Sequence, residues 1–165
     1  MIPLFKSLVR PVVEYANIVW SPFLRKDIRS IENVQRHYTK RIKGMRDLPY
    51  HERLFRLKLP SLQYRRLRGD LIETYKLLNN FYDPVTSNLL ELMPDSSSTR
   101  NHNFKLKKKS FNTNQFKYFY SNRIVNVWNK LPSNVVNAAS LNYFKNAIDC
   151  HFSYLMYETN FDIYY

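Results

Sequence analysis

Apolar residues recur every three or four positions over two long stretches of this chain, and this spacing constrains the fold more than any other feature. Residues 22–43 carry Ile28, Ile31, Val34, Tyr38 and Ile42. Residues 61–79 carry Tyr64, Leu67, Leu71, Tyr75 and Leu78. Such spacing places side chains along one face of an α-helix. We therefore expect two long helices, the first ending at Gly44, a residue typical of a left-handed helix end.

Prolines and turn formers divide the rest of the chain into shorter segments. Pro11 interrupts an apolar segment at residues 4–19, which predicts a kinked helix or two short ones. Further helices are expected over residues 50–57 and 116–130, and a last one begins after Ser140. Its expected buried stripe comprises Leu141, Phe144, Ile148, Phe152 and Leu155. The expected fold class is therefore mainly α.

Residues 94–103 are rich in turn-forming residues and predict a linker. The predicted domains are a basic helical region at 1–93, this linker, a C-terminal extension at 104–156, and a tail at 157–165. Residues 85–93 are expected to add one or two helical turns. After the linker, Phe104 and Leu106 alternate with lysines, which predicts a short strand with a basic outer face and hence a small α+β subdomain.

The composition excludes several functional classes. The two glycines, Gly44 and Gly69, lie far apart, so no glycine-rich nucleotide loop can form. A single cysteine, Cys150, excludes an intrachain disulfide framework and a multi-cysteine zinc site. No stretch is long and apolar enough for a membrane-spanning helix, and the N-terminus lacks the pattern of a secretory signal.

No catalytic or metal-binding residues are expected. The histidines are scattered, no two aspartates are adjacent, and Cys150 stands in an apolar helix, where a core thiol is the simplest reading. Carboxylates lie among arginines, with which ion pairs are expected: Asp27, Glu32, Asp70 and Glu73. We expect no cofactor in this chain and no small-molecule substrate. Five large residues are expected in the core: Trp20, Leu67, Leu71, Trp128 and Phe144.

Basic residues outnumber acidic ones 26 to 13, for a net charge of +13. This excess predicts a polyanionic partner, because Lys and Arg that neutralise phosphates release counterions from nucleic acid. An anionic membrane surface or an acidic protein is the alternative partner, and a solvated charged face is the alternative without a partner. The predicted nucleic-acid contacts form three groups: Arg25, Arg29, Arg36, Lys40 and Lys43; Arg65, Arg66 and Arg68; and Lys105, Lys107 and Lys109.

Several blocks of the sequence, in order, resemble the region after the palm in reverse transcriptases of non-LTR (LINE-type) retrotransposons. The first reads Leu8-Val-Arg-Pro-Val-Val-Glu-Tyr-Ala-Asn-Ile-Val-Trp-Ser-Pro, and the second is Asp27-Ile-Arg-Ser-Ile-Glu-Asn-Val-Gln-Arg. The others are residues 48–54, 59–78, 119–132 and 140–145. Together the blocks cover nearly the whole chain up to about residue 155.

The resemblance implies a helical, thumb-like bundle followed by a small C-terminal subdomain that grips template–primer or element RNA. The palm motif with paired aspartates is absent, so Mg²⁺ is expected only in that missing palm, and no DNA synthesis is expected of this chain. The implied partner is RNA or an RNA–DNA hybrid inside the cell, in a nuclear or cytoplasmic ribonucleoprotein, with no membrane. The alternative is a structural or protein-interaction relic of a retrotransposon without activity of its own.

Overall fold

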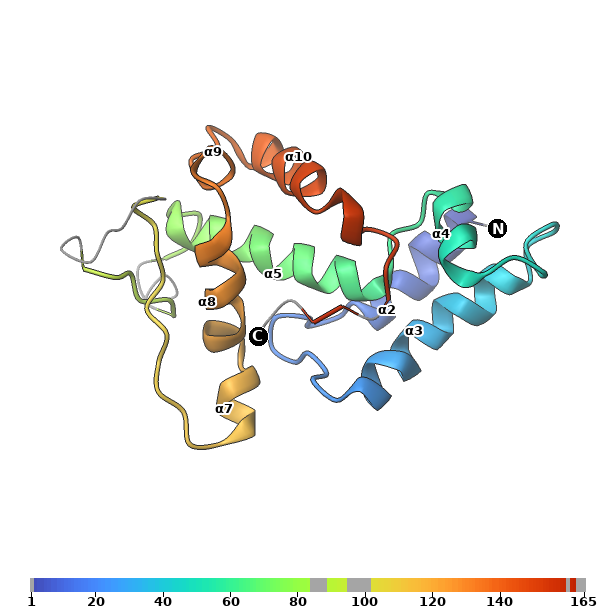
Figure 1. Ribbon diagram of the computed structural model, residues 1–165, viewed down its shortest axis with the longest axis horizontal. Coiled ribbons are helices and arrows are strands. Elements are labelled where there is room, and N and C mark those ends of the chain that lie inside the picture. Colours follow the sequence, from blue (N-terminus) through green and yellow to red (C-terminus); the bar gives the residue numbers. More distant parts are fainter. Residues whose placement is uncertain (1, 84–88, 95–101, 160, 163–165) are drawn as a thin grey trace. The chain divides into compact units, whose positions relative to one another are not determined.

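The computed structural model describes residues 2–83, 89–94, 102–159 and 161–162, and this part of the chain is mainly helical (Figure 1). The chain forms two compact units. Unit 1 consists of Met1–Leu67 with Phe152–Phe161, and unit 2 of Arg68–His151 with Asp162–Tyr165. The boundary between them falls inside helix α5 (Leu62–Leu78). The predicted linker lies mostly outside the described residues, so the domain division at 94–103 stays a prediction.

Unit 1 begins with short consecutive helical segments, as the proline at position 11 predicts. They are α1 (Ile2–Leu4), a π-helical segment (Phe5–Val9) and α2 (Arg10–Val13). Pro11 stands in the first turn of α2, which follows the π-helical segment directly: the Arg10 amide donates to the Phe5 carbonyl, and Pro11 has no N–H to continue that series. Phe5 is fully buried and stacks on Tyr38, with 4.5 Å between ring centroids.

The next two helices are α3 (Arg25–Lys40) and α4 (Tyr50–Leu57). The predicted helix over 22–43 is therefore confirmed with shorter bounds, and that over 50–57 is confirmed at both ends. Gly44 has a φ of +79° in the turn that joins them, a backbone conformation that glycine adopts without steric cost. In α5 the predicted stripe is buried at Tyr64, Leu67, Leu71 and Tyr75.

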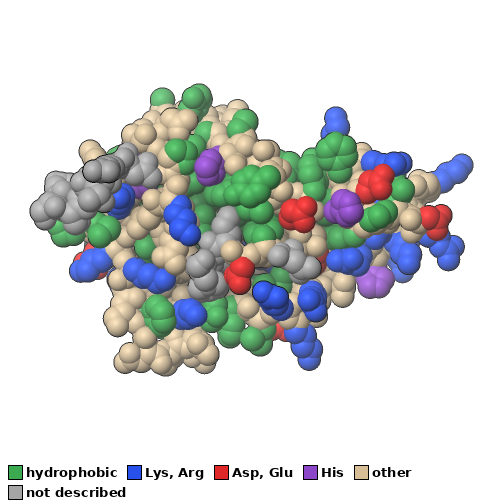
Figure 2. Space-filling model, in the orientation of Figure 1, with side chains coloured by type: hydrophobic (Ala, Val, Ile, Leu, Met, Phe, Trp, Pro, Cys, Tyr) green, Lys and Arg blue, Asp and Glu red, His purple; other side chains and the backbone are tan. Residues whose placement is uncertain are grey.

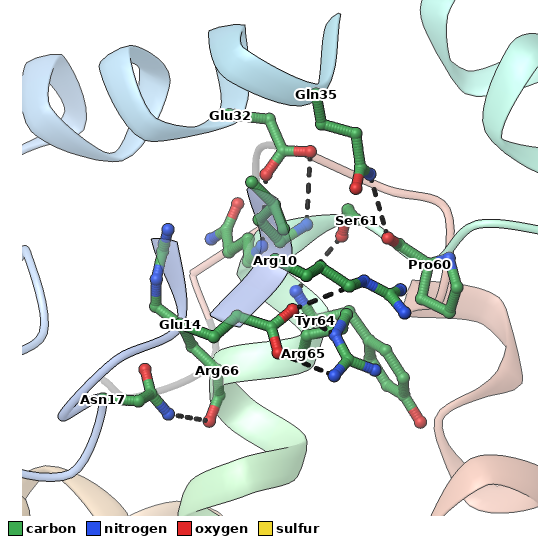
Figure 3. A network of polar contacts seen from close by, with 12 residues as sticks. Arg10, Glu14, Asn17, Glu32, Gln35, Pro60, Ser61, Tyr64, Arg65 and Arg66 are labelled. Atoms are coloured by element: carbon green, nitrogen blue, oxygen red, sulfur yellow. Dashed lines mark hydrogen bonds and ion pairs between the residues drawn. The ribbon is translucent and has the colours of Figure 1, made fainter. Parts of the chain in front are cut away.

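Helix α3 buries polar side chains rather than its apolar stripe. Glu32, Gln35 and Thr39 are at most 2% exposed, whereas Val34 is 40% exposed. The Glu32 carboxylate accepts hydrogen bonds from the Tyr50 hydroxyl (2.6 Å) and from the amides of Leu62 and Gln63 (3.2 Å each). Figure 3 shows Glu32 and Gln35 pointing from α3 toward Pro60 and Ser61. The first amides of a helix lack intrahelical acceptors, so α3 supplies the acceptor for the start of α5. Burial raises the pKa of Glu32 against the opposing effect of these hydrogen bonds.

Unit 2 contains the rest of α5 with α7 (Asn114–Tyr118), α8 (Tyr120–Lys130), α9 (Ser133–Val136) and α10 (Leu141–His151). The helix predicted over 116–130 is two helices, because Phe119 is extended and its carbonyl starts α8 by accepting from Asn122 and Arg123. Ser140 caps α10 as predicted, its hydroxyl accepting from the Tyr143 amide at 3.2 Å.

Four of the five expected core residues are buried, namely Leu67, Leu71, Trp128 and Phe144. The expectation for Trp20 is wrong, since 48% of it is exposed. Trp20 lies in the turn after Ala16, which has a φ of +51°, and not on a helix face. Cys150 is also exposed, which contradicts the core thiol. It stands two residues after the buried Ile148, and positions two apart do not share a helix face.

The expected strand after the linker is reduced, in the described residues, to one isolated antiparallel bridge between Leu92 and Leu106. The other partner of Leu106 is the side-chain amide of Asn129 in α8. It accepts from the Leu106 amide at 2.8 Å and donates to the Leu106 carbonyl at 2.9 Å. The Asn129 side chain thus makes the two backbone hydrogen bonds that a neighbouring strand would make with Leu106 in a sheet.

Unit 2 buries titratable groups. Asp70 and Arg123 are 0% and 4% exposed and form a two-armed ion pair, with both distances 2.8 Å. His102 is 3% exposed, lies edge-on to Trp128, and has neither ring nitrogen hydrogen-bonded within the described residues. Burial lowers the pKa of His102, because the charged ring would lose its hydration.

Candidate nucleic-acid interface

The first predicted group of cations lies on α3 and the turn after it. Arg25, Arg29, Arg36 and Lys40 are exposed, and their steps of four, seven and four residues place them on one face of the helix. Lys43 is exposed in the turn that follows. Figure 2 shows Lys and Arg side chains gathered over this end of unit 1, with some acidic side chains among them. We call Arg25, Arg29, Arg36 and Lys40 the basic face of α3.

Most of this face is not neutralised by carboxylates. Within the described residues, the side chains of Arg29 and Lys40 make no ion pair or hydrogen bond. The Arg36 guanidinium lies 4.4 Å above the centre of the Tyr50 ring, which orients it without cancelling its charge. The face therefore presents positive charge to solvent.

The turn after α3 forms an open pocket of about 570 Å³. Its lining residues are His37, Lys40, Arg41, Ile42, Lys43, Gly44 and Arg46. No acidic residue is among them. His37 donates from Nδ1 to the Asn33 carbonyl at 2.7 Å, which leaves Nε2 for another partner. We call this the turn pocket.

Three residues of this pocket were not predicted from the sequence: Arg41, Arg46 and His37. Arg41 falls outside the helical spacing of the other cations, and Arg46, three residues after Lys43, lies beyond the helix end expected at Gly44. The signal that could have found them is the density of basic residues around Gly44, since residues 40–46 contain Lys40, Arg41, Lys43 and Arg46.

The second predicted group, on α5, is engaged inside the protein. Arg65 forms a two-armed ion pair with Glu14, whose second contact is 2.7 Å, and Arg68 forms one with Asp149 at 2.7 and 2.9 Å. Arg66 is 5% exposed. Arg65 and Arg68 are therefore bound to carboxylates of this chain and Arg66 is buried, so the structure does not support their place in a phosphate track, which stays a prediction (Figure 3 shows Arg65 and Arg66).

The third predicted group belongs to unit 2, whereas α3 belongs to unit 1. Lys107 is exposed and pairs with Glu91 at 2.9 Å. Lys105 and Lys109 are half-buried. The first group therefore lies together on α3 and the turn after it. The three lysines belong to the other unit.

Ion pairing explains part of the carboxylate pattern, but the partners are not the neighbouring arginines: Asp70 binds Arg123, 53 residues away, and Glu73 binds Lys76 at 3.2 Å. Glu32 instead accepts hydrogen bonds from a tyrosine and two backbone amides.

In the part of the chain that the structure describes, no three His, Cys, Asp or Glu side chains gather as metal ligands would. Over the same residues, no helix combines the length and apolar character needed to cross a bilayer.

Comparison with known proteins identifies no relative: no family model, no curated protein and no solved structure matches the chain. The site is therefore interpreted from its own chemistry. Exposed guanidinium and ammonium groups without carboxylate partners bind anions, and phosphate oxygens are acceptors that match the guanidinium group.

Proposed function

We propose that this chain binds nucleic acid through the basic face of α3, as the part of a LINE-type reverse transcriptase that follows the palm. The finer fold belongs to this proposal: a thumb-like helical bundle followed by a small α+β subdomain. The expected partner is RNA or an RNA–DNA hybrid, held by its phosphates. The sequence blocks at 8–22 and 59–78 support the parent family, and the mainly helical fold is compatible with it.

The observation that carries the binding proposal is the contrast in pairing among the arginines. Arg65, Arg68 and Arg123 each hold a carboxylate in a two-armed ion pair, while Arg29 on the basic face has no such partner in the described residues. Arg29 and Lys40 lie on one helix face, and cations without carboxylate partners along such a face match the repeating charge of a phosphate backbone. Contacts to phosphates alone do not read bases, so binding should be almost independent of sequence.

The test measures binding of an RNA–DNA hybrid at several salt concentrations. We compare the parent with Arg29→Gln plus Arg36→Gln, and with a control, Lys130→Gln plus Lys145→Gln, that loses the same charge from unit 2. The logarithm of the affinity should fall linearly with that of the salt concentration, and each lost phosphate contact should lower the slope by about one. The control should keep the parent slope.

Arg36 also stacks on Tyr50, so its loss affects packing as well as charge. A second variant, Arg29→Glu, avoids this contact, and it should weaken binding while the melting temperature stays near that of the parent. Equal weakening in the α3 variants and in the unit 2 control would reject the basic face as the binding site and leave only the effect of net charge.

A further inference from the structure

We propose that the turn pocket binds a phosphate monoester, the terminal phosphate of a nucleic-acid strand. This inference rests on the proposed function, because it assigns the strand end to a position next to the strand-binding face. It goes beyond the proposed function by naming an adjoining site, which shares Lys40 with the basic face, and the chemical group that this site takes. The residues that would hold the phosphate are Lys40, Arg41, Lys43 and Arg46, with His37 at the pocket wall.

The charge of the pocket is the first reason. None of the side chains of Lys40, Arg41, Lys43 and Arg46 makes an ion pair or hydrogen bond within the described residues, and the pocket lining contains no acid. The closely placed cations of α5 differ in this respect, since Arg65 pairs with Glu14 and Arg68 with Asp149. A group of cations without an internal anion favours an anion from outside. A phosphate monoester carries nearly two negative charges at neutral pH and three strong acceptor oxygens.

The position of the pocket at the end of α3 explains how the fold tolerates these charges. The carbonyl end of a helix carries a partial negative charge that stabilises cations nearby. The carbonyls of Tyr38 and Thr39 already accept from the amides of Arg41 and Ile42, at 3.1 and 3.3 Å. Because these two carbonyls already accept hydrogen bonds from amides, a phosphate that enters the pocket would contact mainly the cationic side chains around them.

The shape of the site is the second reason. The basic face is a row of side chains along a helix, which suits phosphodiesters that carry one charge each. The turn pocket is instead a concavity of about 570 Å³, within the usual size range of small-ligand sites. It lies where α3 ends and the chain reverses at Gly44. A group with several charged oxygens fits such a pocket better than a strand that must enter and leave.

The experiment compares one single-stranded oligonucleotide with a 5′-phosphate and with a 5′-hydroxyl. The phosphorylated form should bind about tenfold more tightly, which corresponds to one added charge-assisted hydrogen bond. Arg41→Gln plus Arg46→Gln should bring the two affinities together. The matched pair Arg29→Gln plus Arg36→Gln, which removes the same charge from the helix face, should weaken both oligonucleotides and keep their ratio.

A second measurement separates this site from the proposed function. Inorganic phosphate is titrated at constant ionic strength and about pH 8, where it is a dianion, while the Gly44 amide is followed by NMR. A saturable shift of the Gly44 amide signal that is lost in Arg41→Gln plus Arg46→Gln supports the phosphate site. If this shift is seen but neither oligonucleotide binds, the proposed function is rejected and the phosphate site is kept. Equal affinity for the two oligonucleotides together with no saturable shift would overturn the inference.

Discussion

The arginines of α5 and the cations of α3 differ in what they face. On α5, Arg65 and Arg68 reach carboxylates that are far away in sequence, Glu14 and Asp149. On α3, Arg29 and Lys40 have no carboxylate within reach among the described residues. Both groups look alike in the sequence, as basic residues on amphipathic helices. The difference teaches that arginine spacing alone does not separate a fold-stabilising residue from one that is available to a ligand.

The largest effect should come from the most buried ion pair. Arg123→Met leaves Asp70 fully buried without its partner, and breaking such a pair costs about 3–5 kcal/mol. We expect a strong loss of stability in urea unfolding. Asp70→Leu plus Arg123→Met removes both charges and should recover much of this loss. If Arg123→Met has the same free energy of unfolding as the parent, the pair between Arg123 and Asp70 does not stabilise the fold, and the contrast with the exposed α3 cations fails.

A smaller effect is expected at the half-exposed pair between Arg65 and Glu14, whose side chains are 29% and 23% exposed. Solvent screens such a pair, so Arg65→Gln should lower the free energy of unfolding by about 1 kcal/mol. The same variant should keep the parent salt slope in nucleic-acid binding, because Arg65 is already paired. A slope reduced by one would place Arg65 among the phosphate contacts after all.

Unit 2 should also respond to pH through His102. Its pKa is lowered by burial, so the unfolded chain binds a proton more readily than the folded one. The resulting contribution to stability is complete above the usual histidine pKa of about 6.5 and decreases as the pH falls below it. His102→Phe should reduce this dependence in urea titrations at about pH 8 and about pH 5.5. The exposed His51, changed to Gln, serves as the control and should leave it intact.

The smallest effect on stability is expected at Arg29. Arg29→Gln removes an exposed side chain with no partner in the described residues, so the free energy of unfolding should change by no more than about 0.5 kcal/mol. Its salt slope on an RNA–DNA hybrid should nevertheless fall by about one. A stability loss as large as that of Arg65→Gln would show that the two groups of cations do not differ.

Local sequence rules predicted the helices well. Period and proline placement gave both bounds of α4 and the existence of α3 and α5, because helix formation depends on neighbours three and four residues apart. They also placed Leu67, Leu71, Trp128 and Phe144 in the core. They failed at Phe119, where the helix breaks without a proline or glycine, and at Trp20, which follows a turn at a non-glycine residue of positive φ.

The sequence by itself determined the mainly helical character, the charge excess and the basic face of α3, since each of these depends on residue type and spacing along the chain. Only the tertiary structure decided which cations are neutralised. Glu14 and Asp149 approach α5 from positions 51 and 81 residues away in sequence. The burial of Glu32 likewise depends on Tyr50 and the start of α5. A carboxylate neutralises an arginine according to their distance in space, so the spacing of residues along one helix cannot predict which arginines are neutralised.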